Sequence, residues 1–297
     1  MKRRKFIQVA GATAALGTLP AHLWAQDESN KIATRPIPST GEALPVIGYG
    51  SSATFSGEDF AAASQLLDAL RNAGGKFIDT WPAAQPTFGR YAREKSAHDE
   101  LFLATNLRGK SSESDLLAID AAKKAQGKPV LDMLQLARPA DYDAQWLRMQ
   151  RWKEEGHARY IGLAIAGNSF YEIVESAIRD GADFVQINYS ILEPESGNRL
   201  IPLADDFGVA VVTNRPFVNG RYFPMLQGRE LPDWAAEFDC HSWAQFSLKW
   251  ILGNPLVNCA ITETTKVRHA VENLAAGLGR FPDEKTRARM QSLIRSL

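Results

Sequence analysis

Residues 74–91, "GGKFIDTWPAAQPTFGRY", show the local pattern on which the fold is built and raise the question of function. A short apolar run at 76–79 ends in an acid, Asp79, and the chain then breaks at Pro82 before a helical stretch. This order predicts one strand–helix unit of an alternating β/α fold. An acid at the end of a buried strand is costly unless it has hydrogen-bond partners or a chemical task. Asp79 is therefore the first candidate functional residue.

The same unit recurs along the chain. The short β-rich runs that we predict as strands are 46–50, 76–79, 101–105, 130–136, 160–163, 184–188, 210–213 and 257–261. Helical segments lie between them, and several end in glycine, the usual helix stop. Eight strands that alternate with helices predict a (β/α)8 barrel. The alternative, an open doubly wound sheet, is less favoured because "GYGSSATFSG" lacks the spacing of a dinucleotide-binding turn.

Two segments outside this repeat have interpretations of their own. Extended pieces on either side of "STGE", residues 39–42, predict a β-hairpin ahead of the first barrel strand. The insertion "FVNGRYFPMLQGRELPDWAAEFD", residues 217–239, follows the seventh strand. It suits either a lid over the barrel mouth or a packed surface loop.

Residues 1–25 are predicted to be an export signal. Lys2, Arg3, Arg4 and Lys5 precede a weakly apolar Ala/Gly-rich stretch, and Ala25 suits a cleavage site. The Arg3-Arg4 pair resembles a twin-arginine signal; an ordinary secretory signal or a basic amphipathic end is the alternative. The stretch is too short to span a bilayer, and no cysteine stands directly after it to carry a lipid anchor. We expect residues 26–297 to form one domain, exported folded by the twin-arginine machinery to the periplasm without a membrane anchor.

Composition limits which classes of partner, disulfide and metal site this protein can have. The whole chain has a formal net charge of +0, so loss of the basic signal leaves a mildly acidic surface that does not attract nucleic acid. Cys240 and Cys259 could pair in an oxidising compartment. However, Cys259 lies in the apolar run "LVNCAIT", and we predict two free thiols. The five histidines are scattered, so no metal site is expected.

Motifs along nearly all of the mature chain resemble the aldo-keto reductases. In order they are "RPIPSTGEALPVIGYGSS", "FIDT", "LDMLQLARP", "ARYIGLAI", "DFVQINYS", "IPLADDFGVAVVTNRPF" and "TTKVRHAVENLAA". The resemblance implies a (β/α)8 barrel that reduces carbonyls with NADP(H) through an Asp, a Tyr, a Lys and a His. The Tyr donates a proton to the carbonyl oxygen, the Lys pairs with the Asp and lowers the Tyr pKa, and the His orients the oxygen.

Three of these four positions are changed here. Asp79 matches the catalytic Asp, but Ala84 stands where the Tyr is expected, Asn106 where the Lys is expected and Ala137 where the His is expected. Tyr91 and Lys95 lie in the next helix and do not substitute for them. An alanine side chain can neither donate nor accept a hydrogen bond, so the sequence argues against standard carbonyl reduction.

The cofactor positions implied by the resemblance are mixed. Those that match are Gly50, Ser51, Gln186, Glu272 and Asn273. Ala164 and Ile165 replace the pair that binds the carboxamide, and Asn214 replaces the aromatic residue that stacks on the nicotinamide. Glu263 stands in the loop for the 2′-phosphate, which its charge would repel. Lys266, Arg268 and His269 could attract that phosphate at a helix start, or they are ordinary surface charges.

The barrel mouth offers further candidates: Trp81, Asn106, Arg138, Asn214 and Arg215. Asp79 could accept a hydrogen bond from Asn106, Thr80 or a backbone N–H, or pair with one of the two arginines. Two functions follow. One is a barrel that binds a small ligand or a periplasmic protein without catalysis, which the changed positions favour. The other is an NADP(H)-dependent oxidoreductase with an unusual site. A hydrolase or lyase built on Asp79 has no motif behind it.

Overall fold

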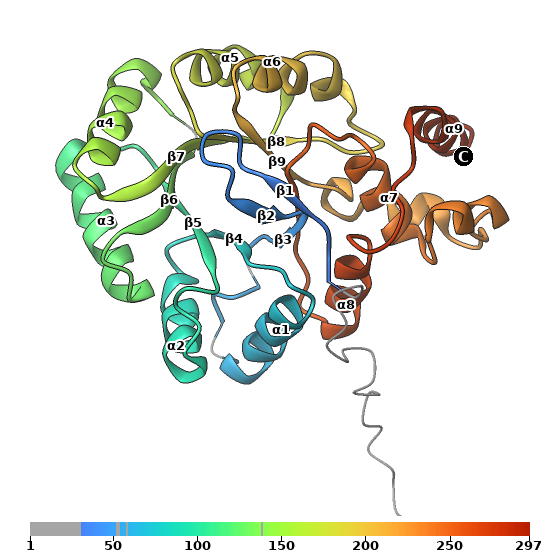
Figure 1. Ribbon diagram of the computed structural model, residues 1–297, viewed down its shortest axis with the longest axis horizontal. Coiled ribbons are helices and arrows are strands. Elements are labelled where there is room, and N and C mark those ends of the chain that lie inside the picture. Colours follow the sequence, from blue (N-terminus) through green and yellow to red (C-terminus); the bar gives the residue numbers. More distant parts are fainter. Residues whose placement is uncertain (1–30, 52–53, 58, 138) are drawn as a thin grey trace, which may run out of the picture.

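The computed structural model describes residues 31–51, 54–57, 59–137 and 139–297. Eight parallel strands close into a barrel in the order β10-β3-β4-β5-β6-β7-β8-β9 (Figure 1). They are β3 (Ile47–Tyr49), β4 (Phe77–Thr80), β5 (Phe102–Leu107), β6 (Leu131–Ala137), β7 (Ala158–Ala164), β8 (Phe184–Asn188), β9 (Ala210–Asn214) and β10 (Cys259–Thr262). Each predicted run overlaps its strand, so the (β/α)8 barrel is confirmed.

Helices surround the barrel on the outside (Figure 1). They are α1 (Phe60–Asn72), α2 (Gln85–Lys95), α3 (Ser112–Gln126), α4 (Tyr142–Glu154), α5 (Tyr171–Arg179), α6 (Leu200–Asp206), α7 (Trp243–Leu252) and α8 (Val267–Ala275), followed by α9 (Glu284–Arg295). Several begin where a side-chain oxygen accepts a hydrogen bond from a free N–H of the first turn. The residues that cap in this way are Asp59, Ser111, Asp141, Ser242 and Asp283.

Side chains that alternate along the strands build two cores. Phe77, Phe102, Tyr160 and Phe184 fill the barrel interior, and ring centroids of neighbouring pairs lie 5.5–5.9 Å apart. Gly162 is required beside them, because a Cβ there would lie 2.7 Å from the Phe184 carbonyl oxygen. The opposite faces of the strands pack against the helices. The interior is thus a packed core, which leaves function to the ends of the barrel.

The predicted hairpin is confirmed and lies across one end of the barrel (Figure 1). Strands β1 (Thr34–Pro36) and β2 (Ala43–Pro45) pair antiparallel, with Thr34 opposite Pro45. Ile37 and Leu44 are fully buried and belong to the same cluster as the barrel interior. The hairpin therefore closes the end at which the barrel strands begin.

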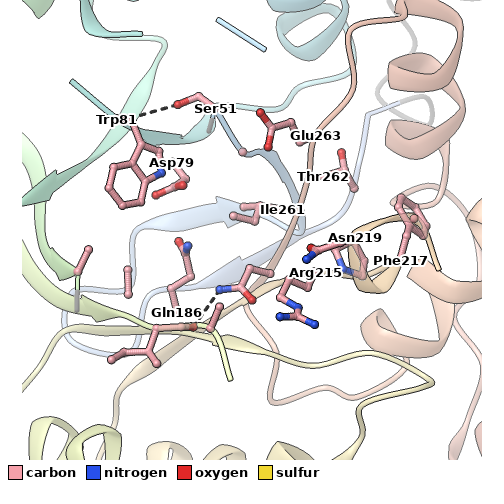
Figure 2. A pocket seen from close by; sticks show the side chains of 18 of the residues that line it. Ser51, Asp79, Trp81, Gln186, Arg215, Phe217, Asn219, Ile261, Thr262 and Glu263 are labelled. Atoms are coloured by element: carbon pink, nitrogen blue, oxygen red, sulfur yellow. Dashed lines mark hydrogen bonds between the residues drawn. The ribbon is translucent and has the colours of Figure 1, made fainter. Parts of the chain in front are cut away.

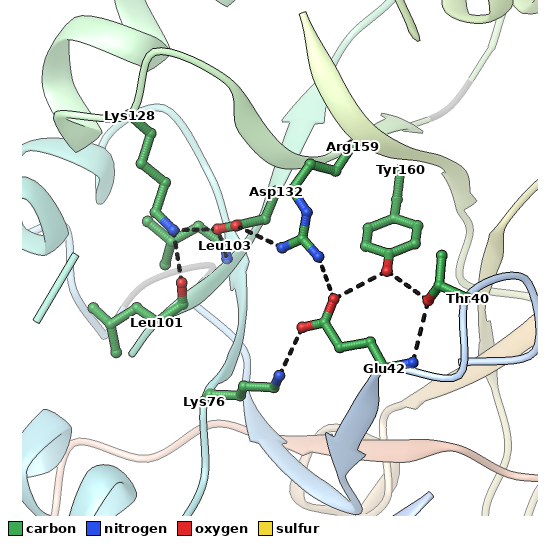
Figure 3. A network of polar contacts seen from close by, with 9 residues as sticks. All are labelled: Thr40, Glu42, Lys76, Leu101, Leu103, Lys128, Asp132, Arg159 and Tyr160. Carbon is green, nitrogen blue, oxygen red and sulfur yellow. Dashed lines mark hydrogen bonds and ion pairs between the residues drawn. The ribbon is translucent and has the colours of Figure 1, made fainter. Parts of the chain in front are cut away.

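A network of charges fastens this hairpin to the barrel (Figure 3). Glu42 forms an ion pair with Lys76 at 2.8 Å and another with Arg159, and it accepts a hydrogen bond from the Tyr160 hydroxyl at 3.0 Å. Burial raises the pKa of Glu42, but hydrogen bonds from Lys76, Tyr160 and Arg159 outweigh it and lower the pKa below its ordinary value. Arg159 also reaches Asp132, so two acids share one cation.

The insertion after β9 folds as three short 3-10 segments: η5 (Val218–Gly220), η6 (Phe223–Leu226) and η7 (Asp233–Phe238). Its first part, including Phe217 and Phe223, lines the cavity described below. Its last part packs on α7, where the rings of Trp234 and Phe246 have centroids 5.8 Å apart. The lid interpretation thus fits the first part and the packed-loop interpretation the last.

Other expectations can be placed on the described residues. Cys240 and Cys259 are free and buried, as predicted. Within the described ranges no helix is long and apolar enough to cross a bilayer. The same residues contain no group of three or more His, Cys, Asp or Glu side chains placed to hold a metal ion. The predicted export signal lies outside the described residues.

Candidate functional site

The ends at which the barrel strands finish surround a cavity of about 700 Å³ (Figure 2). Strand β4 supplies Asp79, β8 supplies Gln186, and β10 supplies Ile261 and Thr262. Loops that follow the strands add the rest of the wall, with Trp81 beside Asp79 and the insertion on the opposite side. This is the end at which barrels of this architecture place their binding residues.

Asp79 is held in place by neutral donors. Its side chain is 5% exposed, and its Oδ1 accepts hydrogen bonds from Asn106 Nδ2 at 2.7 Å and from Gln135 Nε2. The side chain of Trp81 adds a further hydrogen bond. Asn106 and Gln135 are register partners in the β5–β6 pair, which places their amides side by side. Each hydrogen bond that Asp79 receives from a described side chain thus comes from an uncharged group.

This environment changes the acidity of Asp79. Burial raises its pKa, hydrogen bonds from Asn106 and Trp81 lower it, and the nearby charge of Glu263 raises it again. The result is a pKa of about 6 in place of the ordinary 3.8. At neutral pH the Asp79 carboxylate in the cavity is therefore ionised, but its ionisation is less favourable than that of an exposed aspartate.

The partners expected for Asp79 are confirmed in part. Asn106 is one, as predicted, whereas the Thr80 hydroxyl donates to the Ala104 carbonyl at 2.7 Å instead. The proposed pairing with Arg215 is wrong, because Arg215 Nη2 binds Glu193 Oε1 at 2.8 Å. The other candidate, Arg138, lies outside the described residues.

Gln135 and the Trp81 side chain are partners of Asp79 that the sequence analysis does not identify. Gln135 precedes Ala137 by two residues and so faces the same side of β6. That spacing was the available signal. Trp81 is predicted at the barrel mouth and does line the cavity, but the sequence gives no sign of its contact with Asp79.

Glu263 joins two loops at the rim of the cavity. Its Oε1 accepts hydrogen bonds from the Thr54 backbone N–H at 3.0 Å and from the Thr54 hydroxyl at 3.1 Å. Thr54 follows β3, whereas Glu263 follows β10. The carboxylate is therefore fixed at the position for which the family resemblance implies contact with a phosphate.

The positions predicted to hold a cofactor separate into two groups. Gly50, Ser51 and Gln186 line the cavity together with Asp79, Asn214 and Arg215. Lys266, Arg268, His269, Glu272 and Asn273, at and along α8, are not among the residues that line it. The Arg268 guanidinium instead lies 3.2 Å from the ring of His269, and the Glu272 carbonyl accepts a hydrogen bond from Gln245.

Several buried polar atoms at the cavity have no hydrogen-bond partner among the described residues. They are Gln186 Oε1, Thr262 Oγ1, Asn214 Oδ1 and Arg215 Nε. Buried polar groups are normally paired. Arg215 also has a positive φ of 56°, and so does the β-branched Val218, at 49°, a costly conformation that concentrates at functional sites. Unpartnered buried atoms also occur away from the cavity, at Gln126 and Gln145 among others. The strained backbone of Arg215, which lines the cavity, is therefore the feature that marks this wall as a candidate binding surface.

The residues present do not fit a phosphorylated dinucleotide. Gln186 offers a carboxamide, but Asn214 offers no ring for stacking, and its Nδ2 already donates to the Ile165 carbonyl at 3.0 Å. The Ala164 and Ile165 side chains offer no hydrogen bonds. At the other end, the Glu263 carboxylate would oppose a phosphate.

Comparison with known proteins places the chain in a family. A sequence model described as "Aldo/keto reductase family" matches residues 46–294. Among curated proteins, no sequence matches the chain.

Solved structures match the fold at low identity. An aldo-keto reductase from Bacillus halodurans in its holo form superposes with a TM-score of 0.73 at 17% identity, over 88% of this chain and 96% of that one. An aldo/keto reductase from Klebsiella pneumoniae in complex with NADP and acetate gives 0.69 at 20% identity, over 86% and 93%. An aldo/keto reductase from Brucella melitensis gives 0.70 at 21% identity, over 89% and 100%. The chain therefore belongs to the aldo/keto reductase family.

Proposed function

We propose that this protein is an exported member of the family that binds a small ligand in its barrel mouth and does not carry out standard NADPH-dependent carbonyl reduction. The observation that carries the proposal is the surroundings of Asp79, which accepts hydrogen bonds from Asn106, Gln135 and Trp81. None of the described residues that line the cavity is a tyrosine, a lysine or a histidine.

The chemistry explains why this matters. Hydride addition to a carbonyl places negative charge on its oxygen, and a positioned acid must supply a proton. Ala84 is fully buried and carries no phenol. Asp79 has a pKa of about 6 and is mainly ionised at neutral pH, so it would repel the forming alkoxide rather than protonate it. Loss of such an acid typically costs 10²–10⁴-fold in rate, or about 3–5 kcal/mol of barrier.

An NADP(H)-dependent oxidoreductase with an unusual site is the second candidate. It is favoured by Gln186, which lines the cavity and whose buried Oε1 has no hydrogen-bond partner among the described residues, and by the NADP complex of the Klebsiella pneumoniae relative. Asn214 and Glu263 argue against it, because Asn214 offers no ring to stack on the nicotinamide and the Glu263 carboxylate would repel the phosphate. A periplasmic protein that covers the mouth is another occupant consistent with a non-catalytic barrel.

Turnover tests the proposal. Purified mature protein is mixed with NADPH and 4-nitrobenzaldehyde at neutral pH, and NADPH absorbance is followed. We expect kcat below about 0.1 s⁻¹, roughly 100-fold under the median for enzymes. Turnover near 10 s⁻¹ that is lost in Asp79→Asn would overturn the proposal, because it would show that this site performs the reduction.

Export by the twin-arginine route is part of the proposal, and it rests on the residues at the start of the chain. Replacing Arg3 and Arg4 with lysine keeps the charge but removes the paired guanidinium groups. Fractionation should then find the precursor in the cytoplasm. Normal periplasmic accumulation of the lysine variant would count against this route.

A further inference from the structure

We propose that the cavity takes an uncharged, hydroxyl-rich ring, such as a glycoside or a cyclic polyol, and that binding needs no carbonyl group. This inference rests on the proposed function and names the chemistry of its ligand. It follows from three properties of the cavity wall: unpaired hydrogen-bonding groups, the signs of the charges, and flat apolar surfaces.

The unpaired groups call for a ligand that both donates and accepts. Gln186 is 6% exposed and Thr262 is 1% exposed. Both line the cavity, and their side-chain oxygens have no partner among the described residues. Arg215 Nε, by contrast, is a buried donor without an acceptor there. A hydroxyl group can donate to the Gln186 oxygen and accept from Arg215 Nε, whereas an ammonium only donates and a phosphate mainly accepts.

The charges exclude the ionic alternatives. Asp79 and Glu263 both line the cavity and are close enough for Glu263 to raise the Asp79 pKa. An anion would meet both carboxylates. A cation could approach Asp79 but would face the Arg215 guanidinium across the cavity (Figure 2) and leave its Nε unpaired. An uncharged ligand carries neither cost.

Aromatic rings supply the flat surfaces. Trp81 lies on one side of the cavity and Phe217 on the other (Figure 2). Phe170 and Phe223 also line it, and the Phe217 and Phe223 ring centroids lie 5.0 Å apart. The C–H face of a saturated ring can pack on such rings while its hydroxyls point sideways to polar groups. A linear polyol has no comparable face, so we expect rings to bind better.

Isothermal titration at pH 7.5 tests the inference with defined probes. The neutral probes are myo-inositol and the methyl glycosides of glucose, galactose and mannose, none of which has a free carbonyl. The charged probes are 1,4-diaminobutane and inorganic pyrophosphate. We expect at least one neutral probe to bind saturably with a Kd at or below about 1 mM, and neither charged probe to bind.

Two variants connect binding to the cavity. For the probe that binds, Gln186→Leu should raise the Kd about tenfold, as expected for loss of a buried hydrogen-bonding group. Thr262→Val keeps the shape of the side chain and should weaken binding about threefold. The matched control is Gln150→Leu on α4, because the Gln150 amide donates to the Asp180 carbonyl away from the cavity; its Kd should not change.

Three outcomes would overturn the inference: no neutral probe binds, a charged probe binds instead, or Gln186→Leu and Thr262→Val bind as tightly as the wild type. The proposed function is judged separately by NADPH and aldehyde turnover. If no neutral probe binds and NADPH is not turned over, the proposed ligand class is wrong but the proposal of a barrel without reductase activity stands. NADPH turnover removes the proposed function whatever the neutral probes do.

Discussion

Two aspartates are equally buried at opposite ends of the barrel and have opposite surroundings. Asp132, 6% exposed, lies 2.5 Å from Lys128 Nζ and 3.5 Å from Arg159 Nη1, and it accepts a hydrogen bond from the Leu103 N–H. Asp79, 5% exposed, accepts its hydrogen bonds from amides and an indole. Cations neutralise the charge of Asp132, whereas the charge of Asp79 is stabilised only by hydrogen bonds from neutral groups.

This difference separates stability from function. Near the beginnings of the strands, the cations around Glu42 and Asp132 hold the hairpin and the barrel together (Figure 3). Near the strand ends, Asp79 has no cationic partner among the described side chains that bond to it, and four residues that line the cavity carry unpartnered polar atoms. Proteins keep such costly groups where a ligand uses them. Substitutions at the two ends should therefore have different effects on stability.

Asp132→Asn should destabilise the fold by about 3 kcal/mol, because it leaves the Lys128 ammonium buried without its counter-charge. The melting temperature should fall by roughly 6–12 °C. The control is Glu100→Gln, which removes an ion pair with Arg71 from a side chain that is 55% exposed and should have almost no effect. An unchanged melting temperature for Asp132→Asn would show that its cations do not matter.

Asp79→Asn should do the opposite and stabilise the fold. The rise in the Asp79 pKa from 3.8 to about 6 corresponds to about 3 kcal/mol of cost for ionisation. Part of the gain is lost because the new amide accepts less well from Asn106 and Gln135, so about 1–2 kcal/mol is expected at pH 7.5. Denaturant unfolding measures it. Destabilisation comparable to that of Asp132→Asn would remove the contrast between the two ends.

The gain from Asp79→Asn should depend on pH. Because the folded-state pKa of Asp79 is raised, the folded protein holds the proton more tightly than the unfolded chain between pH about 4 and 6. The stability from protonation is present below that window and is lost as the pH rises through about 6. The difference in unfolding free energy between variant and wild type should therefore be largest above pH 7 and should disappear at about pH 4. A constant difference would contradict the raised pKa.

Glu42→Gln should have the smallest effect, a loss of about 1 kcal/mol, because its partners Lys76 and Arg159 are partly solvated. Here the sign with pH is reversed. The Glu42 pKa is lowered, so its contribution is present above the ordinary range of a glutamate and lost as the pH falls through the lowered value. Urea unfolding at pH 7 and at acid pH checks this. A loss that grows on acidification would be inconsistent with the ion pairs.

The fold could be predicted because each strand–helix unit is local. Apolar runs, breaks and glycine stops recur within about 30 residues, and the barrel follows from their number. Asn106 as a partner of Asp79 was also predictable, since both stand at the ends of neighbouring strands. The expected strand limits differ slightly because pairing, which sets where each strand stops, is not local.

The rest of the site depends on contacts between distant segments. The two-residue period of β6 puts Gln135 on the same side as Ala137, but its amide reaches Asp79 because the β5–β6 register places Gln135 opposite Asn106. No sequence pattern sets that register. Glu263 meets Thr54 across 209 residues of chain. Arg215 pairs with Glu193 rather than with Asp79, and its backbone has a positive φ directly after β9. Side-chain directions at such turns cannot be inferred from residue types.

Titration of the purified protein with NADPH tests the central claim, that the mouth of this barrel is no longer built for the dinucleotide. NADPH fluorescence is followed at pH 7.5, with Glu263→Lys as the matched variant. We predict no saturation below about 100 μM for the wild type and tighter binding for Glu263→Lys, because the substitution replaces a repelling charge with an attracting one. Saturable binding of the wild type with a Kd of a few micromolar, unimproved by Glu263→Lys, would contradict the account.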